Sequence, residues 1–428
     1  MQNDVNALHK ESFMTLIEFF DISPLQNISG VLYFPVDRVY FIGANSRKMN
    51  AARDVYRRVW SRLGKNVDIR LVCVPKYGME FSADELCKII EAEKDVIIDV
   101  SGGNDYLLAA AGIAFERCKN KNVQLQHFSV RSEKFVSFGN ALVLPQKHER
   151  VKLLCDEVIE LHGGKIVYAE DKRSGTVRWD FSHDGFRDDI IKMWDICKRD
   201  NRTWNRCCAR MGELENFATA LDGKSYTVRL DVDVSKSYAY SKNKKQLLCE
   251  LEPHLKKLSD AGLIKGYTND GDVLRFHFKN EQVRGCLLKA GNALELITYL
   301  AAAEAKTKKG SKVYCDALSG VVLDWDGTLS GINDTENEID GLFIKGMIPV
   351  FVSCKNGGVD ENELYKLSSV AEHFGVKYAK KVLVATDLQK NFTSLRCFKA
   401  RADEMGVTII DGVHRMTFGE LCKRLANV

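Results

Sequence analysis

The sequence predicts an α/β protein with an N-terminal parallel-sheet domain, a middle α+β region and a C-terminal domain of α-β-β-β-α-β order. Strand and helix signals alternate over residues 1–148, which is typical of a parallel sheet covered by helices on both faces. A long helical pattern over 283–306 precedes three β-type segments and another helix. The length of 428 residues is enough for two or three domains.

In the N-terminal domain, 1–148, apolar segments alternate with amphipathic ones. The predicted strands are 36–44, 67–75, 94–103, 123–130 and 141–145, and the predicted helices are 51–64, 82–93 and 104–120. Ser82 is the expected N-cap of the second helix. In such sheets, ligands bind where strands end and helices begin, so this edge is the expected binding site.

The middle region, 149–280, mixes short strands with charged helices. The predicted strands are 163–170, 175–182, 225–240 and 272–280, and the predicted helices are 188–221 and 244–264. The pattern fits either a small winged helix or a spacer between domains. Basic residues surround Trp204, namely Lys198, Arg199, Arg202, Arg206 and Arg210. They could form a groove for single-stranded nucleic acid with Trp204 as a stacking platform, but a solvated helix face with a core tryptophan is favoured.

The C-terminal domain, 281–428, has helix and strand signals in the order α-β-β-β-α-β. Its predicted helices are 283–306, 361–375 and 393–406, and its predicted strands are 312–327, 335–346, 347–355, 380–387 and 407–413. Three of these strands are consecutive, which favours an antiparallel meander between two helices.

Composition limits the possible functions. The net charge of +4 neither requires nor excludes a nucleic-acid partner, because charge can be concentrated on one face. The thirteen cysteines are scattered and show no CxxC spacing, which indicates a reduced, cytoplasmic protein rather than a disulfide framework or a zinc site. No apolar segment approaches the ~20 residues of a membrane span, so no membrane association is expected.

The C-terminal meander carries the residues for phosphodiester cleavage. Asp340 and Lys355 are predicted on neighbouring antiparallel strands. A carboxylate that holds a divalent metal and a lysine that positions water are the minimum for this chemistry. Glu295, in the preceding helix, can add a second carboxylate. Mn²⁺ or Mg²⁺ would take oxygen ligands from Asp340, Glu295 and the carbonyl of Cys354.

This order of residues resembles the core of PD-(D/E)xK nucleases, in which an Asp is followed by an acid–x–Lys on the next strand. Ser353 stands at the acid position before Lys355, so one carboxylate is missing. The alternative is an ordinary surface ion pair between Asp340 and Lys355. Glu338 lies on the same strand face as Asp340 and is a secondary candidate. Asp324 is more simply a turn residue.

Two small-residue turns follow strands of the N-terminal sheet. One comprises Gly43, Ala44, Asn45 and Ser46, and the other comprises Ser101, Gly102, Gly103, Asn104 and Asp105. Such turns let main-chain N–H groups approach an anion at a helix N-terminus. Neither is GxGxxG, which argues against a dinucleotide-dependent oxidoreductase, and neither is a GxxxxGK[ST] phosphate loop. Together they predict a nucleotide or oligonucleotide ligand.

Over essentially its full length the chain resembles the CRISPR-associated CARF-domain effector nucleases of the Card/Can group, which occur with type III systems. The resemblance lies in the segments FFDISPLQNISGVLYFPVDRVYFIGA, IGANS and DVSGGND, and in GNALE, TENEIDG and VSCKNG. It implies a Rossmann-like CARF domain and a restriction-endonuclease-like domain in a homodimer. It also implies that cyclic oligoadenylate, most simply cyclic tetra-adenylate, activates cleavage of single-stranded RNA and DNA, with nicking of duplex DNA also open.

The same resemblance implies that Glu295, Asp340, Ser353 and Lys355 are the nuclease residues, and that the two glycine-containing turns contact the cyclic ligand. A second hypothesis stays open because of Ser353. The chain could be a CARF sensor with an inactive nuclease-like domain that binds nucleic acid as a regulator.

Overall fold

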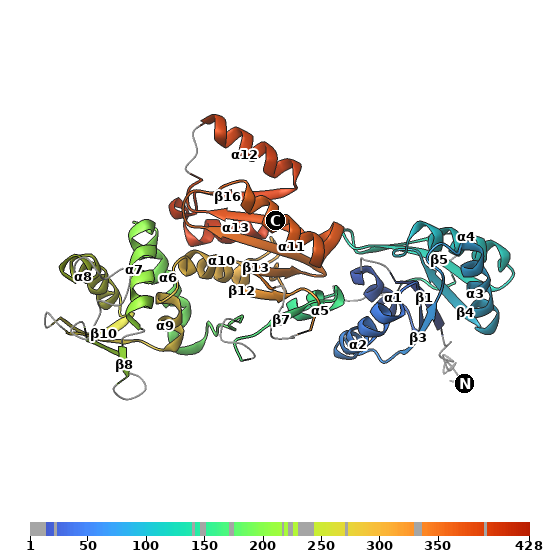
Figure 1. Cartoon of the computed structure of the whole chain (residues 1–428). Coiled ribbons are helices and arrows are strands. Elements are labelled where there is room, and N and C mark those ends of the chain that lie inside the picture. The colour runs from blue at the N-terminus through green and yellow to red at the C-terminus, as the bar shows by residue number, and fades with distance from the viewer. Residues whose placement is uncertain are drawn as a thin grey trace, which may run out of the picture.

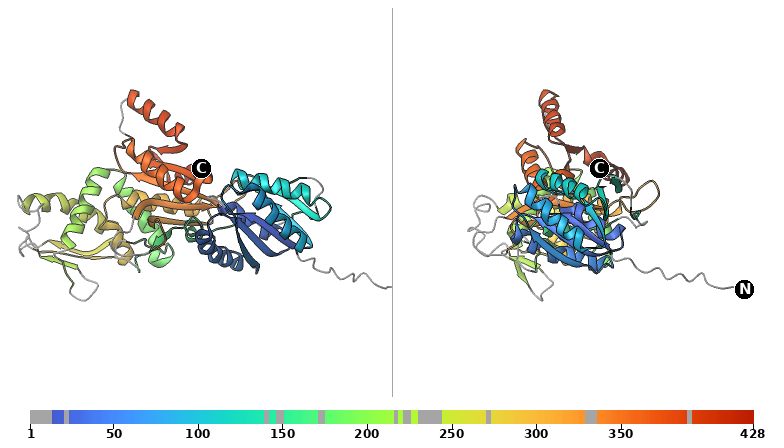
Figure 2. Two further views of the ribbon diagram at one scale, coloured as in Figure 1. Left: turned by 45° about the vertical axis from the view of Figure 1, so that its right-hand side comes forward. Right: turned by 90° about the vertical axis from the view of Figure 1, so that its right-hand side faces the viewer.

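The structure is a computed structural model that describes residues 14–428, except for short segments. These are 21–23, 139–141, 146–150, 171–174, 216–217, 221–225, 230–243, 270–272, 329–335 and 389–391. Three parts follow one another in space: the N-terminal sheet domain, the C-terminal domain at the centre, and the middle region at the far end (Figure 1). The same order is visible after a turn of 45°, and after a turn of 90° the N-terminal domain lies in front of the other parts (Figure 2).

The N-terminal domain contains a six-stranded sheet of order β3-β2-β1-β4-β5-β6. The strands are β1 (Met14–Phe19), β2 (Val36–Gly43), β3 (Asp68–Cys73), β4 (Asp95–Asp99), β5 (Asn122–Ser129) and β6 (Lys134–Phe138). The first five are parallel, and β6 runs antiparallel to β5. The prediction missed β1, a central strand, and its strand over 141–145 is wrong, because the antiparallel edge strand ends at Phe138.

Helices cover both faces of this sheet, as predicted. One face carries η1 (Pro24–Ile28), α1 (Ser29–Tyr33) and α2 (Ser46–Arg62), and the other carries α3 (Met79–Ala92) and α4 (Asp105–Arg117). The predicted N-cap at Ser82 is wrong, because α3 begins three residues earlier. The Ser82 hydroxyl instead donates to the carbonyl of Gly78 within the first turn, at 2.8 Å.

The C-terminal domain contains a second six-stranded sheet, of order β16-β15-β14-β13-β12-β7. Its strands are β7 (Lys165–Val167), β12 (Asp316–Asp324), β13 (Glu336–Lys345), β14 (Ile348–Lys355), β15 (Lys380–Ala385) and β16 (Val407–Asp411). β12, β13 and β14 form the predicted antiparallel meander, and β15 and β16 continue parallel to β14.

Alternating side chains of these strands point to opposite faces of the sheet and pack into two hydrophobic cores. Phe351 faces α5 (Cys155–Leu161), α11 (Asn362–Gly375) and α12 (Phe392–Glu404), whereas Val350 and Val352 face α10 (Asn292–Glu304) and α13 (Phe418–Ala426). The single helix predicted over 283–306 is two helices, α9 (Glu281–Leu287) and α10. Gly291, at φ +88°, separates them in a conformation that favours glycine.

The predicted boundary between the middle and C-terminal domains needs one revision. β7 was expected in the middle region, but it pairs with β12 at the edge of the C-terminal sheet. α5 packs beside it against β12 and β13. Residues 155–167 are therefore structurally part of the C-terminal layer, because their apolar side chains are needed to cover that sheet.

The middle region contains α6 (Phe186–Cys197), α7 (Asn201–Glu215), α8 (Lys244–Asp260) and a four-stranded sheet. Its strands are β8 (Ala218–Ala220), β9 (Tyr226–Arg229), β10 (Ile264–Asn269) and β11 (Val273–Phe278). The helix predicted over 188–221 is divided between α6 and α7, and its prediction over Ala218–Ala220 is wrong, because these residues form β8. Most of the β segment predicted after Arg229 lies outside the described residues. The strand predicted over 175–182 is wrong: there is a single bridge between Tyr168 and Thr176.

These findings confirm the α/β fold class with two sheet domains and an α+β region. Within the described part of the chain, no helix combines the length and the apolar character that crossing a membrane requires.

Candidate functional site

Asp340 is held in place by the strand beside it. The β13–β14 register pairs Gly341 with Val352, so the next pair along the ladder is Asp340 and Ser353. Oδ2 of Asp340 accepts hydrogen bonds from the main-chain N–H of Cys354 at 2.6 Å and from the Ser353 hydroxyl at 3.2 Å. The carboxylate is thereby fixed at the end of the meander, on the side where β14 ends.

Lys355 lies between two carboxylates. Its Nζ is 3.9 Å from Oδ2 of Asp340 and 2.9 Å from Oε2 of Glu363, in the first turn of α11. Burial alone would lower the pKa of Lys355, but Asp340 and Glu363 raise it above the ordinary value. The ammonium group therefore stays charged. The predicted pair with Asp340 exists, but the shorter contact is to Glu363, which the sequence analysis did not identify.

Glu295 enters the same site from α10. Its side chain is 8% exposed, and its Oε2 has no hydrogen-bond partner among the described residues. Burial and the neighbouring charge of Asp340 raise the pKa of Glu295 to about 7, although Lys289 opposes this. Burial also raises the pKa of Asp340, against the effect of Lys355. Two carboxylates that are both costly to ionise thus face each other.

A divalent cation is one way to relieve that cost. Within the described ranges no group of three or more His, Cys, Asp or Glu side chains could hold a metal, so a cation bound by Glu295 and Asp340 would need main-chain oxygens or water as further ligands. The unpartnered, buried oxygen of Glu295 beside Asp340 fits a hard cation. Burial raises the pKa of the Cys354 thiol, so this residue could contribute only its carbonyl oxygen.

The other acidic candidates have different roles. Glu338 is half-exposed and bonds to Lys289 at 2.5 Å, at the rim of the site. Asp324 is buried and accepts from the main-chain N–H groups of Asp326 and Gly327, as expected of a turn residue. Trp204 is only 2% exposed in α7, so the stacking-platform interpretation is wrong and the core interpretation is confirmed.

Ser353 offers a direct test of the missing acid. Ser353→Asp is expected to lower the Mn²⁺ concentration at which the metal site is half-saturated about 10-fold, because metal affinity is sensitive to the groups next to the ligands. The same change should destabilise the metal-free protein by about 1–3 kcal/mol, because it adds a third buried carboxylate. Metal titrations and urea unfolding of Ser353→Asp and of the matched amide Ser353→Asn measure both effects. Equal behaviour of the two variants would contradict the prediction.

The second candidate site lies on the N-terminal sheet, where β2 and β4 end on either side of β1. Asn45 caps α2 by accepting from the N–H of Lys48, and Asn104 caps α4 by accepting from the N–H of Leu107, both at 3.0 Å. The two helices thus begin at the same edge, with Ala44, Asn45 and Ser46 exposed. The two predicted turns are therefore neighbours, and they can offer main-chain N–H groups to phosphate.

One predicted side chain at this edge points inward. The Ser101 hydroxyl bonds to the buried carboxylate of Asp99 and accepts from the N–H of Phe128 at 2.5 Å. The main-chain N–H of Ser101 also donates to Asp99, at 2.8 Å, so neither this N–H nor the hydroxyl is available to a ligand. Glu18, opposite Asp99 in the register of β1 and β4, is fully buried, and burial followed by the Asp99 charge raises its pKa. The sequence analysis missed Glu18 because it missed β1.

The sequence matches no protein-family model and no curated protein. Among solved structures, the fold is similar to that of protein VC1899 from Vibrio cholerae, with 15% identity over 97% of both chains and a TM-score of 0.67. It is also similar to Can2 from Sulfobacillus thermosulfidooxidans, solved in complex with cyclic tetra-adenylate, with 15% identity, 97% of this chain and 100% of that chain covered, and a TM-score of 0.59. At this level of identity the two likenesses establish the shared fold over nearly the whole chain.

Proposed function

We propose that the protein is a metal-dependent nuclease activated by a cyclic oligoadenylate, most simply cyclic tetra-adenylate, in type III CRISPR antiviral defence. The observation that carries the nuclease assignment is the juxtaposition of Glu295, Asp340 and Lys355 at one end of the β12–β14 meander. Residues 1–148 form the sensor domain, 281–428 together with 155–167 form the nuclease domain, and the rest of 149–280 is the middle region. The full-length similarity to Can2, which was solved with cyclic tetra-adenylate, supports the choice of ligand.

In the nuclease domain, Asp340 and Glu295 hold a divalent cation, Mn²⁺ or Mg²⁺, with the Cys354 carbonyl as a further ligand. When bound, such a cation lowers the pKa of coordinated water and neutralises phosphate charge. Lys355 orients the attacking water or stabilises charge that develops on the phosphate. Ser353 and the N–H of Cys354 keep Asp340 in place through their hydrogen bonds. The substrate is single-stranded RNA or DNA.

In the sensor domain, Gly43–Ser46 and residues 102–105 bind the phosphates of the ring. Tyr106, which follows the second turn, is 47% exposed and makes an edge-on contact with Tyr77, which is 66% exposed. Exposed aromatic rings at this edge suit a ligand with bases, because bases stack on aromatic side chains. A two-fold symmetric ring would contact the same loops from both chains of a homodimer.

Incubation with labelled single-stranded RNA or DNA tests this function. Cleavage is expected only when both Mn²⁺ or Mg²⁺ and cyclic tetra-adenylate are present, since the ring must favour the active arrangement. Reactions without metal, without the ring, or with linear tetra-adenylate are the controls. Cleavage that is independent of the ring would contradict the regulatory half of the proposal, and binding of the ring without any cleavage would contradict the nuclease half.

The regulator alternative is favoured by one feature, the serine at position 353 in place of an acid. It predicts that the ring changes the affinity for single-stranded nucleic acid with no cleavage at any metal concentration. A gel-shift measurement alongside the cleavage reaction separates the two functions.

A further inference from the structure

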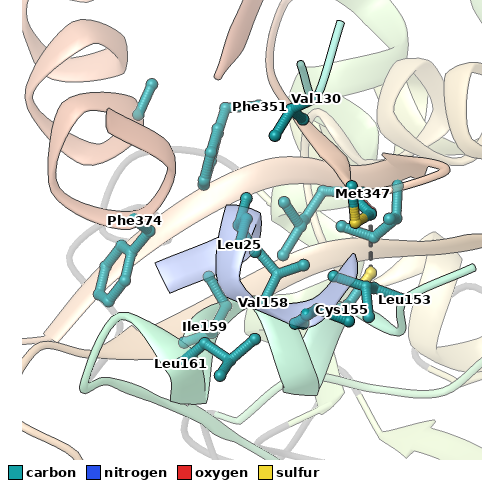
Figure 3. Close-up of a cluster of buried hydrophobic side chains, with 14 of the residues drawn as sticks. Leu25, Val130, Leu153, Cys155, Val158, Ile159, Leu161, Met347, Phe351 and Phe374 are labelled. Atoms are coloured by element: carbon teal, nitrogen blue, oxygen red, sulfur yellow. Dashed lines mark hydrogen bonds between the residues drawn. The ribbon is translucent and has the colours of Figure 1, made fainter. Parts of the chain in front are cut away.

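A buried segment separates the proposed ligand loops from the nuclease domain. Residues 24–33, which form η1 and α1, are all buried. Leu25 belongs to the same apolar cluster as Val158, Phe351 and Phe374 of the C-terminal domain. Figure 3 shows Leu25 lying between α5 and the β14–α11 side of that domain. The segment therefore belongs to the N-terminal domain in sequence but to both domains in its packing.

Gln26, in this segment, lies between the Gly102 loop and the C-terminal domain. A Cβ atom added to Gly102 would lie 2.7 Å from Nε2 of Gln26 and 3.0 Å from Oδ1 of Asn27, so the loop main chain sits directly against η1. On the other side, Oε1 of Gln26 accepts a hydrogen bond from the Tyr378 hydroxyl at 2.9 Å. Gln26 is 1% exposed, so its hydrogen bond with Tyr378 is not replaced easily by water. Because there is no room for a side chain between Gly102 and η1, movement of Gly102 toward η1 would displace Gln26.

Tyr378 lies just beyond the C-terminal end of α11, after a strained turn. Val376 has φ +47° and ψ −133°, a conformation that a β-branched residue rarely adopts. Gly375, before it, is so close to Pro349 and Ala379 that an added Cβ would be 2.9 Å and 2.6 Å from their side chains. A turn held by its surroundings in an unfavourable conformation is suited to having a second arrangement.

The opposite end of α11 reaches the proposed active site. Glu363, in its first turn, holds Lys355 at 2.9 Å, and Lys355 lies 3.9 Å from Asp340. An α-helix of this length, Asn362–Gly375, spans about 20 Å as a rigid rod. Tyr378 follows the turn at Val376, so a change in that turn would alter how α11, and with it Glu363, is held against the sheet.

We propose that Gln26, Tyr378 and α11 form the link through which ligand binding at residues 102–105 repositions Glu363 and Lys355. This inference rests on the proposed function and adds how the two sites communicate within one chain. Glu363 is a positioning residue, because it acts on the reacting atoms through Lys355. The link requires that the turn at Val376 has two arrangements. The ligand must bind one of them more tightly than the other, and the two must hold Lys355 and Glu363 differently.

The variant Tyr378→Phe tests the link, because it removes one hydroxyl and leaves the ring in place. The control is Tyr365→Phe, at an exposed position of α11. Binding of cyclic tetra-adenylate is measured by calorimetry, and amide hydrogen exchange of 362–378 is measured with and without the ring. In the wild type and in Tyr365→Phe, the ring should alter exchange in α11. Tyr378→Phe should bind the ring yet lose that change, and its stimulation of cleavage should fall at least about fivefold, the lower end of typical allosteric coupling.

Glu363→Gln is the second variant. It removes the charge that holds Lys355 at 2.9 Å, so this variant should still bind the ring while the stimulation of cleavage by the ring falls. If the wild type does not bind the ring, the proposed function and the link both fail. If the ring binds while exchange in α11 stays unchanged, or if Tyr378→Phe responds like the wild type, the link alone is overturned.

Discussion

Replacing Asp340 by asparagine is expected to reduce metal-dependent cleavage on the order of 10³-fold, and Lys355→Met is expected to have a similar effect. Asparagine keeps the shape and one oxygen of Asp340, so the hydrogen bonds from Ser353 and Cys354 can persist while the metal loses its negative ligand. Single-turnover cleavage of labelled single strands, at saturating ring concentration and with Mn²⁺ varied, is the measurement.

The matched control for Lys355→Met is Lys366→Met. Both lysines bond to Glu363, at 2.9 Å and 3.1 Å, but the Lys366 side chain is 73% exposed on α11. Near-normal cleavage is expected for Lys366→Met. A loss equal to that of Lys355→Met, or full activity in Asp340→Asn, would show that these residues do not carry the reaction. Because burial raises the pKa of Asp340, the neutral asparagine should not destabilise the fold, and loss of activity would not reflect unfolding.

Strand alternation and the order of elements could place Asp340 and Lys355 together, but they could not place Glu363, although it follows Lys355 closely in the sequence. Asp340 and Lys355 are on consecutive strands, so alternation and order place them together. Glu295 could be added because its helix precedes the meander directly. Glu363 also contacts Lys355, but only the packing of α11 on the sheet brings it there, and no spacing in the sequence indicates it.

The elements of the fold could likewise be predicted only where the local sequence pattern indicates them. Strands followed by helices, such as β2 and β4, were found from their apolar segments. The central strand β1 was missed, since it leads into η1 and α1 rather than into an amphipathic helix. That omission also hid Glu18 and Gln26, which are buried beneath the ligand loops and are defined only by long-range contacts. β7 was assigned to the wrong region because a three-residue strand carries no information about its partner.

Glu295 should make the stability of the metal-free protein depend on pH. The pKa of its carboxyl in the folded protein is about 7, above the ordinary 4.5 expected for the unfolded chain, so the folded state binds the proton more tightly. Its contribution to stability is therefore full below pH 4.5, declines as pH rises, and is lost above pH 7. At about 1.4 kcal/mol per pH unit, the loss amounts to about 3 kcal/mol.

Glu295→Gln removes this dependence, because the amide stays neutral. We expect the variant to be more stable than the wild type at pH 8 in EDTA, and the two to be alike near pH 4.5, as measured by urea unfolding. Adding Mn²⁺ at pH 8 should stabilise the wild type but not the variant, since the cation would offset the charges of the ionised Glu295 and Asp340 carboxylates. Glu372→Gln, at a carboxylate that is 70% exposed, should differ from the wild type equally at both pH values. A Mn²⁺ response that survives in Glu295→Gln would place the cation elsewhere, and the helix and the meander would then no longer form one metal site.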